Sequence, residues 1–253
     1  MNNSRRKFVK KVGLAGLAAL GIPELLMADT SNETLKTPGK TGGLTILFQG
    51  DSITDGNRTR NNDWNHVMGH GYPYLISSRF WFDYPEKDFM FYNRGISGNR
   101  AKDLDDRWQT DTLDLKPDVI SILVGINDVG ATVHNRNPEP LKKFEEHYRS
   151  ILDKTKKVLP GTQIILCEPF ILPVGKVLEN LEIYETEVKK QQKIIRKLAK
   201  NYNAVFVELQ KPFTKACEKA PANYWIWDGI HPMPAGHELI AREWIIHAQN
   251  ILT

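Results

Sequence analysis

A short apolar run, residues 119–124, limits the folds open to this 253-residue chain more than any other feature. Its residues are Val-Ile-Ser-Ile-Leu-Val, so both alternating faces are almost entirely apolar. A strand of this kind is typical of a parallel sheet that helices cover on both faces. Four further runs rich in β-branched or aromatic residues predict strands at residues 44–48, 89–93, 163–167 and 204–207.

Helical patterns separate these strands along the chain. They are predicted at residues 72–82, 101–113, 138–158, 178–200 and 235–251. Because strands and helices alternate, the sequence predicts an α/β fold: a three-layer α/β/α sandwich built on a five-stranded parallel sheet. No internal repeat or break divides the region that follows residue 43.

The net charge of +4 comes from the first 28 residues, where five basic residues stand against Glu24. The rest of the chain is balanced, which argues against a nucleic-acid-binding face. Cys167 lies inside an apolar run, so we expect a buried thiol. An oxidising compartment would permit a bridge to Cys217, but the spacing of the two cysteines does not require one.

The beginning of the chain resembles a bacterial export signal. Residues 4–10, Ser-Arg-Arg-Lys-Phe-Val-Lys, contain the paired arginines of the twin-arginine type, and a weakly apolar run follows them. That run is too short to span a bilayer, so we predict export to the periplasm or beyond without stable membrane insertion. A retained anchor and a basic tail are the alternatives. We assign residues 1–28 to a signal peptide, 29–43 to a linker and 44–253 to the mature domain.

Ser52 directly follows the first predicted strand, within Gly50-Asp51-Ser52. A tight turn at this point can lift the serine hydroxyl clear of the sheet. In open α/β sheets ligands bind in the crevice beyond the carboxyl ends of the strands. Gly-Asp-Ser is also common in ordinary turns, so the serine alone does not establish a nucleophile.

Three other patterns should meet Ser52 at the same edge of the sheet. Gly98 follows the second strand, Gly125-Ile-Asn127-Asp follows the third, and Asp228-Gly-Ile-His231 precedes the last helix. Taken singly, each has a simpler explanation: a residue at positive φ, a turn, and a helix-capping turn. Together, and in this order behind these elements, the patterns indicate a catalytic site.

The chemistry of acyl transfer needs these residue types. A serine hydroxyl is a weak nucleophile until a base removes its proton, and His231 can act as that base. Asp228 can orient the imidazole and stabilise the imidazolium that forms. The backbone N–H groups of Ser52 and Gly98, with the side-chain amide of Asn127, can donate hydrogen bonds to the oxyanion of a tetrahedral intermediate.

As a set, these patterns resemble the four sequence blocks of the SGNH (GDSL-type) hydrolase superfamily. The resemblance implies a flavodoxin-like sandwich, a Ser52–His231–Asp228 triad, and an oxyanion hole formed by Ser52, Gly98 and Asn127. Where the family's signature has leucine after the serine, this chain has isoleucine. Gly95 is an alternative for the second block, but the family's Asn-x-x-x-x-Gly spacing favours Gly98.

Trp64, Asn61 and Trp227 are the candidate substrate-binding residues. Aromatic and polar side chains suit a sugar better than a fatty chain, which would require an apolar groove. The tryptophans could instead belong to the core. We therefore predict a serine esterase that removes short acyl groups, in particular acetyl, from a small-molecule or polysaccharide ester. A lysophospholipase or acyl thioesterase, and a carbohydrate-binding protein with an inactive site, are the alternatives.

No cofactor is predicted. His66 and His70 could bind a metal ion if their segment were helical, but no partner ligands are evident, so we predict no metal site. Arg58 and Arg60 could recognise an acidic sugar or could face solvent. Nothing in the sequence indicates the oligomeric state.

Overall fold

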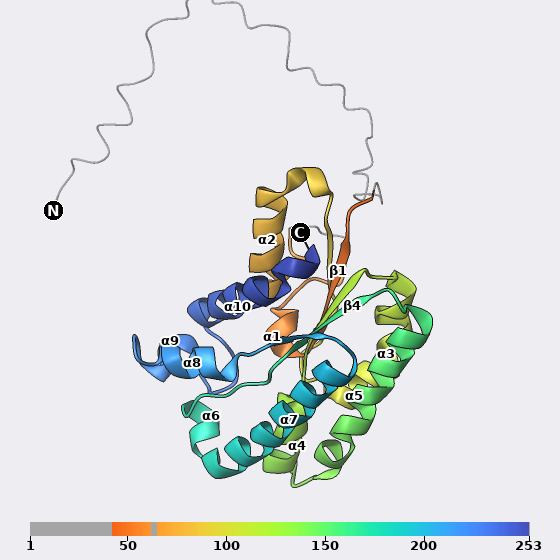
Figure 1. The fold of residues 1–253 in the computed structure, drawn as a ribbon. Helices are drawn as coiled ribbons and strands as arrows, with labels where there is room; N and C mark the ends of the chain where they lie inside the picture. The colour runs from red at the N-terminus through yellow and green to blue at the C-terminus, as the bar shows by residue number, and fades with distance from the viewer. Residues whose placement is uncertain (1–41, 62–64, 253) are drawn as a thin grey trace, which may run out of the picture. The chain divides into compact units, whose positions relative to one another are not determined.

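A computed structural model describes residues 42–61 and 65–252 of the chain (Figure 1). Its sheet has five strands in the order β2-β1-β3-β4-β5. All neighbouring strands pair in parallel. The strands are β1 Thr45–Gly50, β2 Met90–Asn93, β3 Val119–Leu123, β4 Gln163–Cys167 and β5 Val205–Val207. The predicted five-stranded parallel sheet is confirmed.

Helices cover both faces of the sheet (Figure 1). The helices α2 (Tyr72–Asp83) and α10 (Pro234–Leu252) pack on one face. On the other face lie α3 (Ala101–Asp111), α5 (Glu139–Val158) and α7 (Leu181–Asn201). This is the predicted three-layer α/β/α sandwich. The helix ends predicted from the apolar spacing lie within a few residues of the ends in the structure.

Each layer of the core contains one fully buried tryptophan. Trp244 of α10 donates a hydrogen bond from Nε1 to Ser121 Oγ at 2.9 Å, which satisfies the only polar side chain of β3. Trp108 of α3 donates in the same way to Thr155 Oγ1 at 3.0 Å. Both indole N–H groups therefore have the partner that a buried tryptophan requires.

The short helices were not predicted. They are α1 Ser52–Asp55, α4 Ile126–Asn135, α6 Gly175–Leu178, α8 Gln210–Ala216 and α9 Ala222–Trp225. Four of them are too short to show a helical period. The ten-residue α4 contains Gly130 and several β-branched residues, which lower helix propensity.

Two predicted helices have different ends in the structure. The helix predicted at 178–200 begins three residues later, as α7 starts at Leu181, and Leu178 is instead the last residue of α6. The helix predicted at 101–113 ends at Asp111 and is followed by a 3₁₀ turn, η2 (Leu113–Leu115). A second 3₁₀ turn, η1 (Pro85–Lys87), precedes β2.

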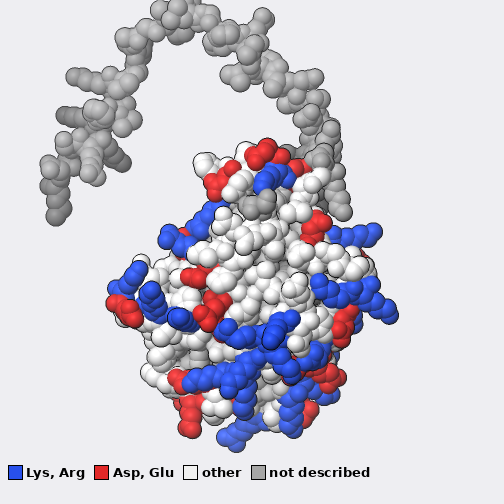
Figure 2. Space-filling view, in the orientation of Figure 1, with Lys and Arg blue, Asp and Glu red and all other residues white. Residues whose placement is uncertain are grey.

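Charged side chains mark the solvent sides of α5 and α7. Figure 2 shows Lys and Arg gathered over the lower half of the face on view, with Asp and Glu among them. On α7, Lys189 Nζ lies 3.0 Å from Glu185 and Lys190 Nζ lies 2.7 Å from Glu187. Exposed pairs of this kind contribute only about 0.3–0.5 kcal/mol each, so packing of the apolar stripe holds α7 in place.

The predicted signal peptide lies outside the described residues, as does the predicted linker apart from its last two positions. Within residues 42–61 and 65–252, no helix combines the length and the apolar character needed to cross a membrane. Cys167 is buried, Cys217 is partly buried, and both thiols are free.

Candidate active site

Ser52 begins the one-turn helix α1 immediately beyond the end of β1. Gly50 makes this sharp change of direction possible, because a Cβ at that position would lie 2.2 Å from Thr54 Oγ1 and 2.4 Å from the Leu123 carbonyl oxygen. Asp51 Oδ1 then accepts a hydrogen bond from the Ile53 N–H at 3.0 Å and caps the turn. The strand and its cap therefore fix the backbone that carries the serine.

The structure brings Ser52, His231 and Asp228 into one hydrogen-bonded chain. Ser52 Oγ lies 2.8 Å from His231 Nε2, and His231 Nδ1 lies 2.8 Å from Asp228 Oδ2. The other oxygen of Asp228 accepts the backbone N–H groups of Ile230 and His231, at 3.0 and 2.7 Å. The Asp228 carboxylate thus holds both the ring and the backbone of His231. The ring in turn links this carboxylate to the Ser52 hydroxyl.

A small closed loop presents Asp228 and His231. Ile226 and Pro232 form an antiparallel bridge, and the Trp227 N–H donates to the His231 carbonyl at 3.2 Å. Gly229, at φ +90°, packs so closely that an added Cβ would lie 2.5 Å from the Val174 carbonyl oxygen. Only glycine fits that conformation and that space without strain.

Lys176 also contacts the carboxylate and was not predicted. Its Nζ lies 2.9 Å from Asp228 Oδ2. Burial by itself would raise the pKa of Asp228, but the hydrogen bonds from His231 and Lys176 hold that pKa well below its usual range. Asp228 is therefore ionised at neutral pH. No sequence signal marks Lys176, which lies in a Pro-rich segment far along the chain from Asp228.

A hydrogen bond links Asn127, in the first turn of α4, to the turn that contains Gly98. Asn127 Nδ2 donates to the carbonyl oxygen of Asn99 at 3.0 Å, which links α4 to the turn that contains Gly98. Gly98 has φ +85°, and a Cβ added there would meet nothing within 4 Å. A glycine is thus favoured at position 98 by the backbone conformation and not by close packing.

Asn93 ties the second block to the first. Its Nδ2 donates to the carbonyl oxygens of Thr54 and Met68, at 2.7 and 3.0 Å. Its Oδ1 accepts the Gly95 N–H at 2.9 Å. The end of β2 is therefore attached to α1 through one buried amide, and the N–H of Gly95 already has a partner.

Arg58 and Arg60 stabilise the turn after β2 and do not form a free cationic surface. Arg58 is buried, and its Nε donates to the Gly95 carbonyl at 2.9 Å. Burial lowers the pKa of Arg58 to about 10, and the positive charge of the nearby Arg60 is the second cause. Arg60 pairs with Asp55 at 2.7 Å, and the N–H and hydroxyl of Ser97 both donate to Asp55 at 3.0 Å.

Of the candidate substrate-binding residues, Trp227 lies beside the histidine. Its ring stacks on that of His231, with centroids 6.2 Å apart and planes 22° apart, and the residue is 61% exposed. It is therefore not a core residue. Asn61 is exposed, and Trp64 lies outside the described residues.

The segment that carries His66 and His70 forms turns and not a helix, so the i, i+4 geometry considered for a metal site is not present. Among the residues that the structure describes, no group of three or more His, Cys, Asp or Glu side chains is arranged to hold a metal ion.

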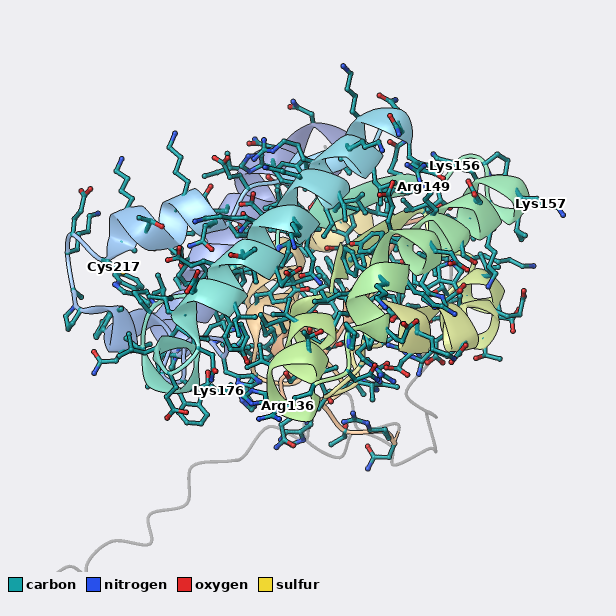
Figure 3. All side chains as sticks on the ribbon, turned by 90° about the horizontal axis from the view of Figure 1, so that it is seen from below. Arg136, Arg149, Lys156, Lys157, Lys176 and Cys217 are labelled. Atoms are coloured by element: carbon teal, nitrogen blue, oxygen red, sulfur yellow. The ribbon has the colours of Figure 1, made fainter. Side chains whose placement is uncertain are left out.

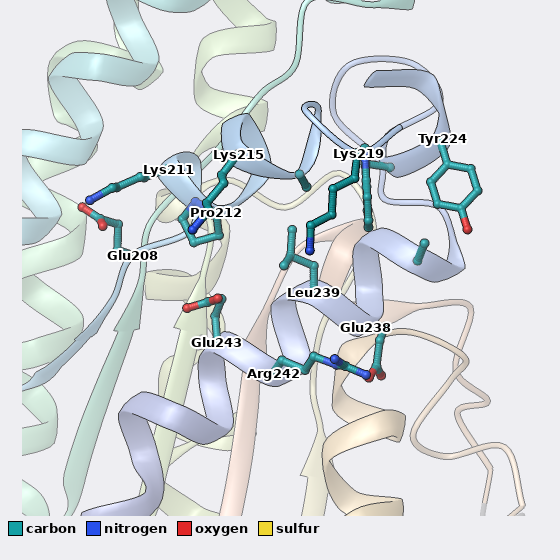
Figure 4. Close-up of a pocket in the computed structure, with 13 residues that line it drawn as sticks. Glu208, Lys211, Pro212, Lys215, Lys219, Tyr224, Glu238, Leu239, Arg242 and Glu243 are labelled. Atoms are coloured by element: carbon teal, nitrogen blue, oxygen red, sulfur yellow. The ribbon is translucent and has the colours of Figure 1, made fainter. Parts of the chain in front are cut away.

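Two of the cavities that described residues line lie away from Ser52, His231 and Asp228. One, of about 620 Å³, is lined by α8, α9 and α10 residues that include Lys215, Tyr224 and Arg242 (Figure 4). The other, of about 430 Å³, is lined by residues that include Leu172 and Val188. None of the residues of the Ser52–His231–Asp228 chain lines either cavity.

Asp128, next to Asn127, is a buried carboxyl that makes stability depend on pH. Its Oδ2 accepts the Ala101 N–H at the start of α3, at 3.2 Å, and burial raises the pKa of Asp128 to about 8. In the unfolded chain an aspartate titrates near 4. The stability that the protonated carboxyl contributes is therefore complete below about pH 4 and is lost as the pH rises through about 8.

Asp128→Asn keeps an acceptor for the Ala101 N–H and removes the charge. We expect this variant to lose less stability between pH 5 and pH 9 than the wild type, by about 1–3 kcal/mol. Urea unfolding at pH 5, 7 and 9 measures the difference, with the exposed Asp83→Asn as control. Equal pH dependence in wild type and Asp128→Asn would contradict this account.

Comparison with known proteins places these features in one family. Residues 48–239 match the GDSL-like Lipase/Acylhydrolase family. A crystal structure from Parabacteroides merdae ATCC 43184, described as a GDSL-like lipase, is 38% identical with a TM-score of 0.78, and the match covers 81% of this chain and 95% of that one.

An acetylxylan esterase of Geobacillus stearothermophilus is 32% identical over 209 residues, which are 80% of this chain and 93% of that protein. Its crystal structure superposes with a TM-score of 0.72 over 81% of this chain and 94% of that one. Solved catalytic mutants of that esterase replace a serine, an aspartate and a histidine. An uncharacterized lipoprotein of Bacillus subtilis (strain 168) is 27% identical over 120 residues, 47% of this chain and 49% of that protein.

Proposed function

The chain belongs to the GDSL-like lipase/acylhydrolase family and is a carboxylic ester hydrolase, and we propose that it removes acetyl groups from carbohydrate esters by serine catalysis. The observation that carries the mechanism is the continuous hydrogen-bonded chain from Ser52 Oγ through His231 to Asp228, with both links at 2.8 Å. Nucleophile, base and orienting carboxylate at such distances are the arrangement that activates a serine.

In the proposed reaction, Ser52 Oγ attacks the ester carbonyl carbon while His231 Nε2 takes the hydroxyl proton. Asp228 holds the Nδ1–H and stabilises the imidazolium. Collapse of the tetrahedral intermediate breaks the ester C–O bond, and His231 returns the proton to the departing sugar hydroxyl. Water, deprotonated by the same histidine, then releases acetate from the acyl-enzyme.

The oxyanion hole is assigned to the backbone N–H groups of Ser52 and Gly98 and to the Asn127 amide. Ser52 is the first residue of a helix, where the N–H group has no acceptor within the helix. Gly98 is preferred to Gly95 because the N–H of Gly95 is bonded to Asn93. The bond from Asn127 to Asn99 uses one of the two amide hydrogens, so the other is available for the intermediate.

The exposed indole of Trp227 supports a sugar substrate. A flat aromatic face beside the base offers a stacking surface for a pyranose ring. Asn61 and Trp64 remain candidate substrate-binding residues on the basis of the sequence. The 32% identity to an acetylxylan esterase of G. stearothermophilus supports acetyl groups on a polysaccharide as the substrate class.

We assign residues 1–28 to a twin-arginine-type signal peptide, with residues 29–43 as linker and 44–253 as the hydrolase domain. The paired arginines, and the likeness of part of the chain to a lipoprotein, support export. An exported esterase would meet polymeric carbohydrate that does not enter the cell.

The acyl specificity is tested with p-nitrophenyl acetate, p-nitrophenyl octanoate and acetylated xylo-oligosaccharides. We expect kcat/KM for the acetate to exceed that for the octanoate by at least about tenfold, because neither of the two cavities described above has Ser52, His231 or Asp228 in its lining, so neither would hold the acyl chain of an ester bound at Ser52. Acetate release from the oligosaccharides should follow. A preference for octanoate would move the assignment to lipid or thioester substrates.

A further inference from the structure

The Asp228 carboxylate has a second cationic partner besides His231. Lys176 Nζ lies 2.9 Å from Asp228 Oδ2, the same oxygen that accepts the His231 Nδ1–H at 2.8 Å. The lysine side chain is 38% exposed, whereas the carboxylate is only 6% exposed. The pair therefore lies at the boundary between solvent and the buried end of the triad.

The fold builds this contact through the backbone on either side of Lys176. Figure 3 shows Lys176 on the short helix α6. Gly175, at φ +52°, lies so close to the triad loop that an added Cβ would be 2.6 Å from Asp228 Cα. The Leu172 N–H donates to the Gly229 carbonyl at 3.1 Å, and a Cβ on Gly229 would lie 2.5 Å from Val177 Cβ. Segment 172–177 is thus fitted against the triad loop on both sides of the lysine.

The positive charge of Lys176 makes it less favourable for the neighbouring His231 imidazole to become protonated. The carboxylate of an Asp–His pair favours the imidazolium, and the base must be neutral before it can accept the serine proton. The Lys176 ammonium, bound to the same oxygen, offsets part of the negative charge that the ring senses. It also restrains the carboxylate, whose other oxygen is held by the Ile230 and His231 N–H groups.

We propose that Lys176 is a positioning residue for ester hydrolysis: it shares the Asp228 carboxylate with His231 and so keeps the imidazole neutral, and able to accept the Ser52 proton, at lower pH than the Asp–His pair alone would allow. This inference rests on the proposed function, because it assigns His231 as the general base. It extends the triad to a fourth residue, which acts through Asp228 and does not touch the reacting atoms.

Other titratable groups face the triad from the elements packed around it. Asp51, at the end of β1, is buried, which raises its pKa to about 7. His237 of α10 has its pKa lowered to about 4 by burial and then by His70 and His231. Burial, with Asp228 nearby, raises the pKa of Tyr184 of α7 to about 12. These groups are the same in wild type and in a Lys176 variant, so the difference between the two profiles isolates the lysine.

The test is the pH profile of kcat/KM for p-nitrophenyl acetate in Lys176→Met, which keeps the length of the side chain and removes the charge. We expect the acidic limb to move to higher pH by about 0.5–1 unit, with the rate at the plateau little changed. Lys176→Arg should retain the wild-type profile. Lys189→Met, which removes an exposed lysine of α7 paired with Glu185, is the matched control and should shift nothing.

An acidic limb that stays in place in Lys176→Met would overturn the proposal. So would a raised KM with an unmoved limb, since that result would make Lys176 a substrate contact. NMR titration of the His231 ring in wild type and Lys176→Met measures the same effect without turnover, and an unchanged midpoint would also overturn it. If the wild type hydrolysed no ester while this midpoint moved as expected, the proposed function would fail and the electrostatic coupling would stand.

Discussion

Ser52→Ala is expected to lower kcat for p-nitrophenyl acetate by about 10⁴- to 10⁶-fold while the protein remains folded. The variant lacks the oxygen that would form the acyl-enzyme, and neither His231 nor Asp228 can replace it. The hydroxyl makes its hydrogen bond to the partly exposed ring of His231, so its removal leaves no buried polar group without a partner. The fold should therefore lose less than about 1 kcal/mol.

Steady-state kinetics and the urea midpoint measure the two halves of this prediction. Ser78→Ala, on α2, is the matched control and should keep wild-type rates. Turnover by Ser52→Ala within tenfold of the wild type would remove Ser52 from the mechanism. Loss of activity together with loss of cooperative unfolding would leave the nucleophile assignment without support from this variant.

Asp228→Asn is expected to lower kcat by about 10⁴-fold with a much smaller change in KM. The amide can donate a hydrogen bond to His231 Nδ1, which places the ring proton on Nε2. Nε2 would then donate toward Ser52 Oγ, when the reaction requires it to accept. The exposed indole of Trp227, the proposed sugar-binding surface, keeps its side chain in this variant, which is why KM should change little.

The pH dependence and a surface control distinguish this tautomer effect from a general loss of structure. Asp83→Asn, at the exposed end of α2, should behave as the wild type. Rates of Asp228→Asn should recover partly at alkaline pH if hydroxide can replace the base. Activity near the wild-type level at pH 7 would show that Asp228 does not orient the base.

The strands and long helices were predictable because their signals are local. The run at 119–124 becomes β3, and the apolar spacing of α5 and α7 is visible within a few turns. The helix α4 was not predictable in that way. Its Gly130 and β-branched residues disfavour a helix, and packing against α5 and against α7, which begins about 45 residues later in the chain, stabilises it.

The residues of the candidate site show the same difference between local signals, which could be predicted, and contacts between distant segments, which could not. Asp228 and His231 form a pattern within four residues, and Ser52 follows a recognisable strand. The sequence alone was therefore enough to propose all three as candidate site residues. Lys176 forms no pattern with Asp228, because their contact depends on how a Pro-rich segment folds back against the triad loop. The role of Arg58 was equally hidden, since a buried arginine and an exposed one look alike in a polar stretch of sequence.

The two hydrogen bonds that link Ser52, His231 and Asp228 differ greatly in the length of chain that they join. Asp228 and His231 are three residues apart and sit in a loop closed by its own bridge, whereas Ser52 and His231 are separated by 179 residues. The first contact has almost no loop-closure entropy to overcome, while the second requires the first strand and the last helix to be docked on the same sheet. During folding, the contact between Asp228 and His231 can therefore form early, but Ser52 meets His231 only when the sandwich is essentially complete. If these three residues are the proposed triad, a chain that has folded only in part has no complete site, and activity should appear only in the last, cooperative step of folding.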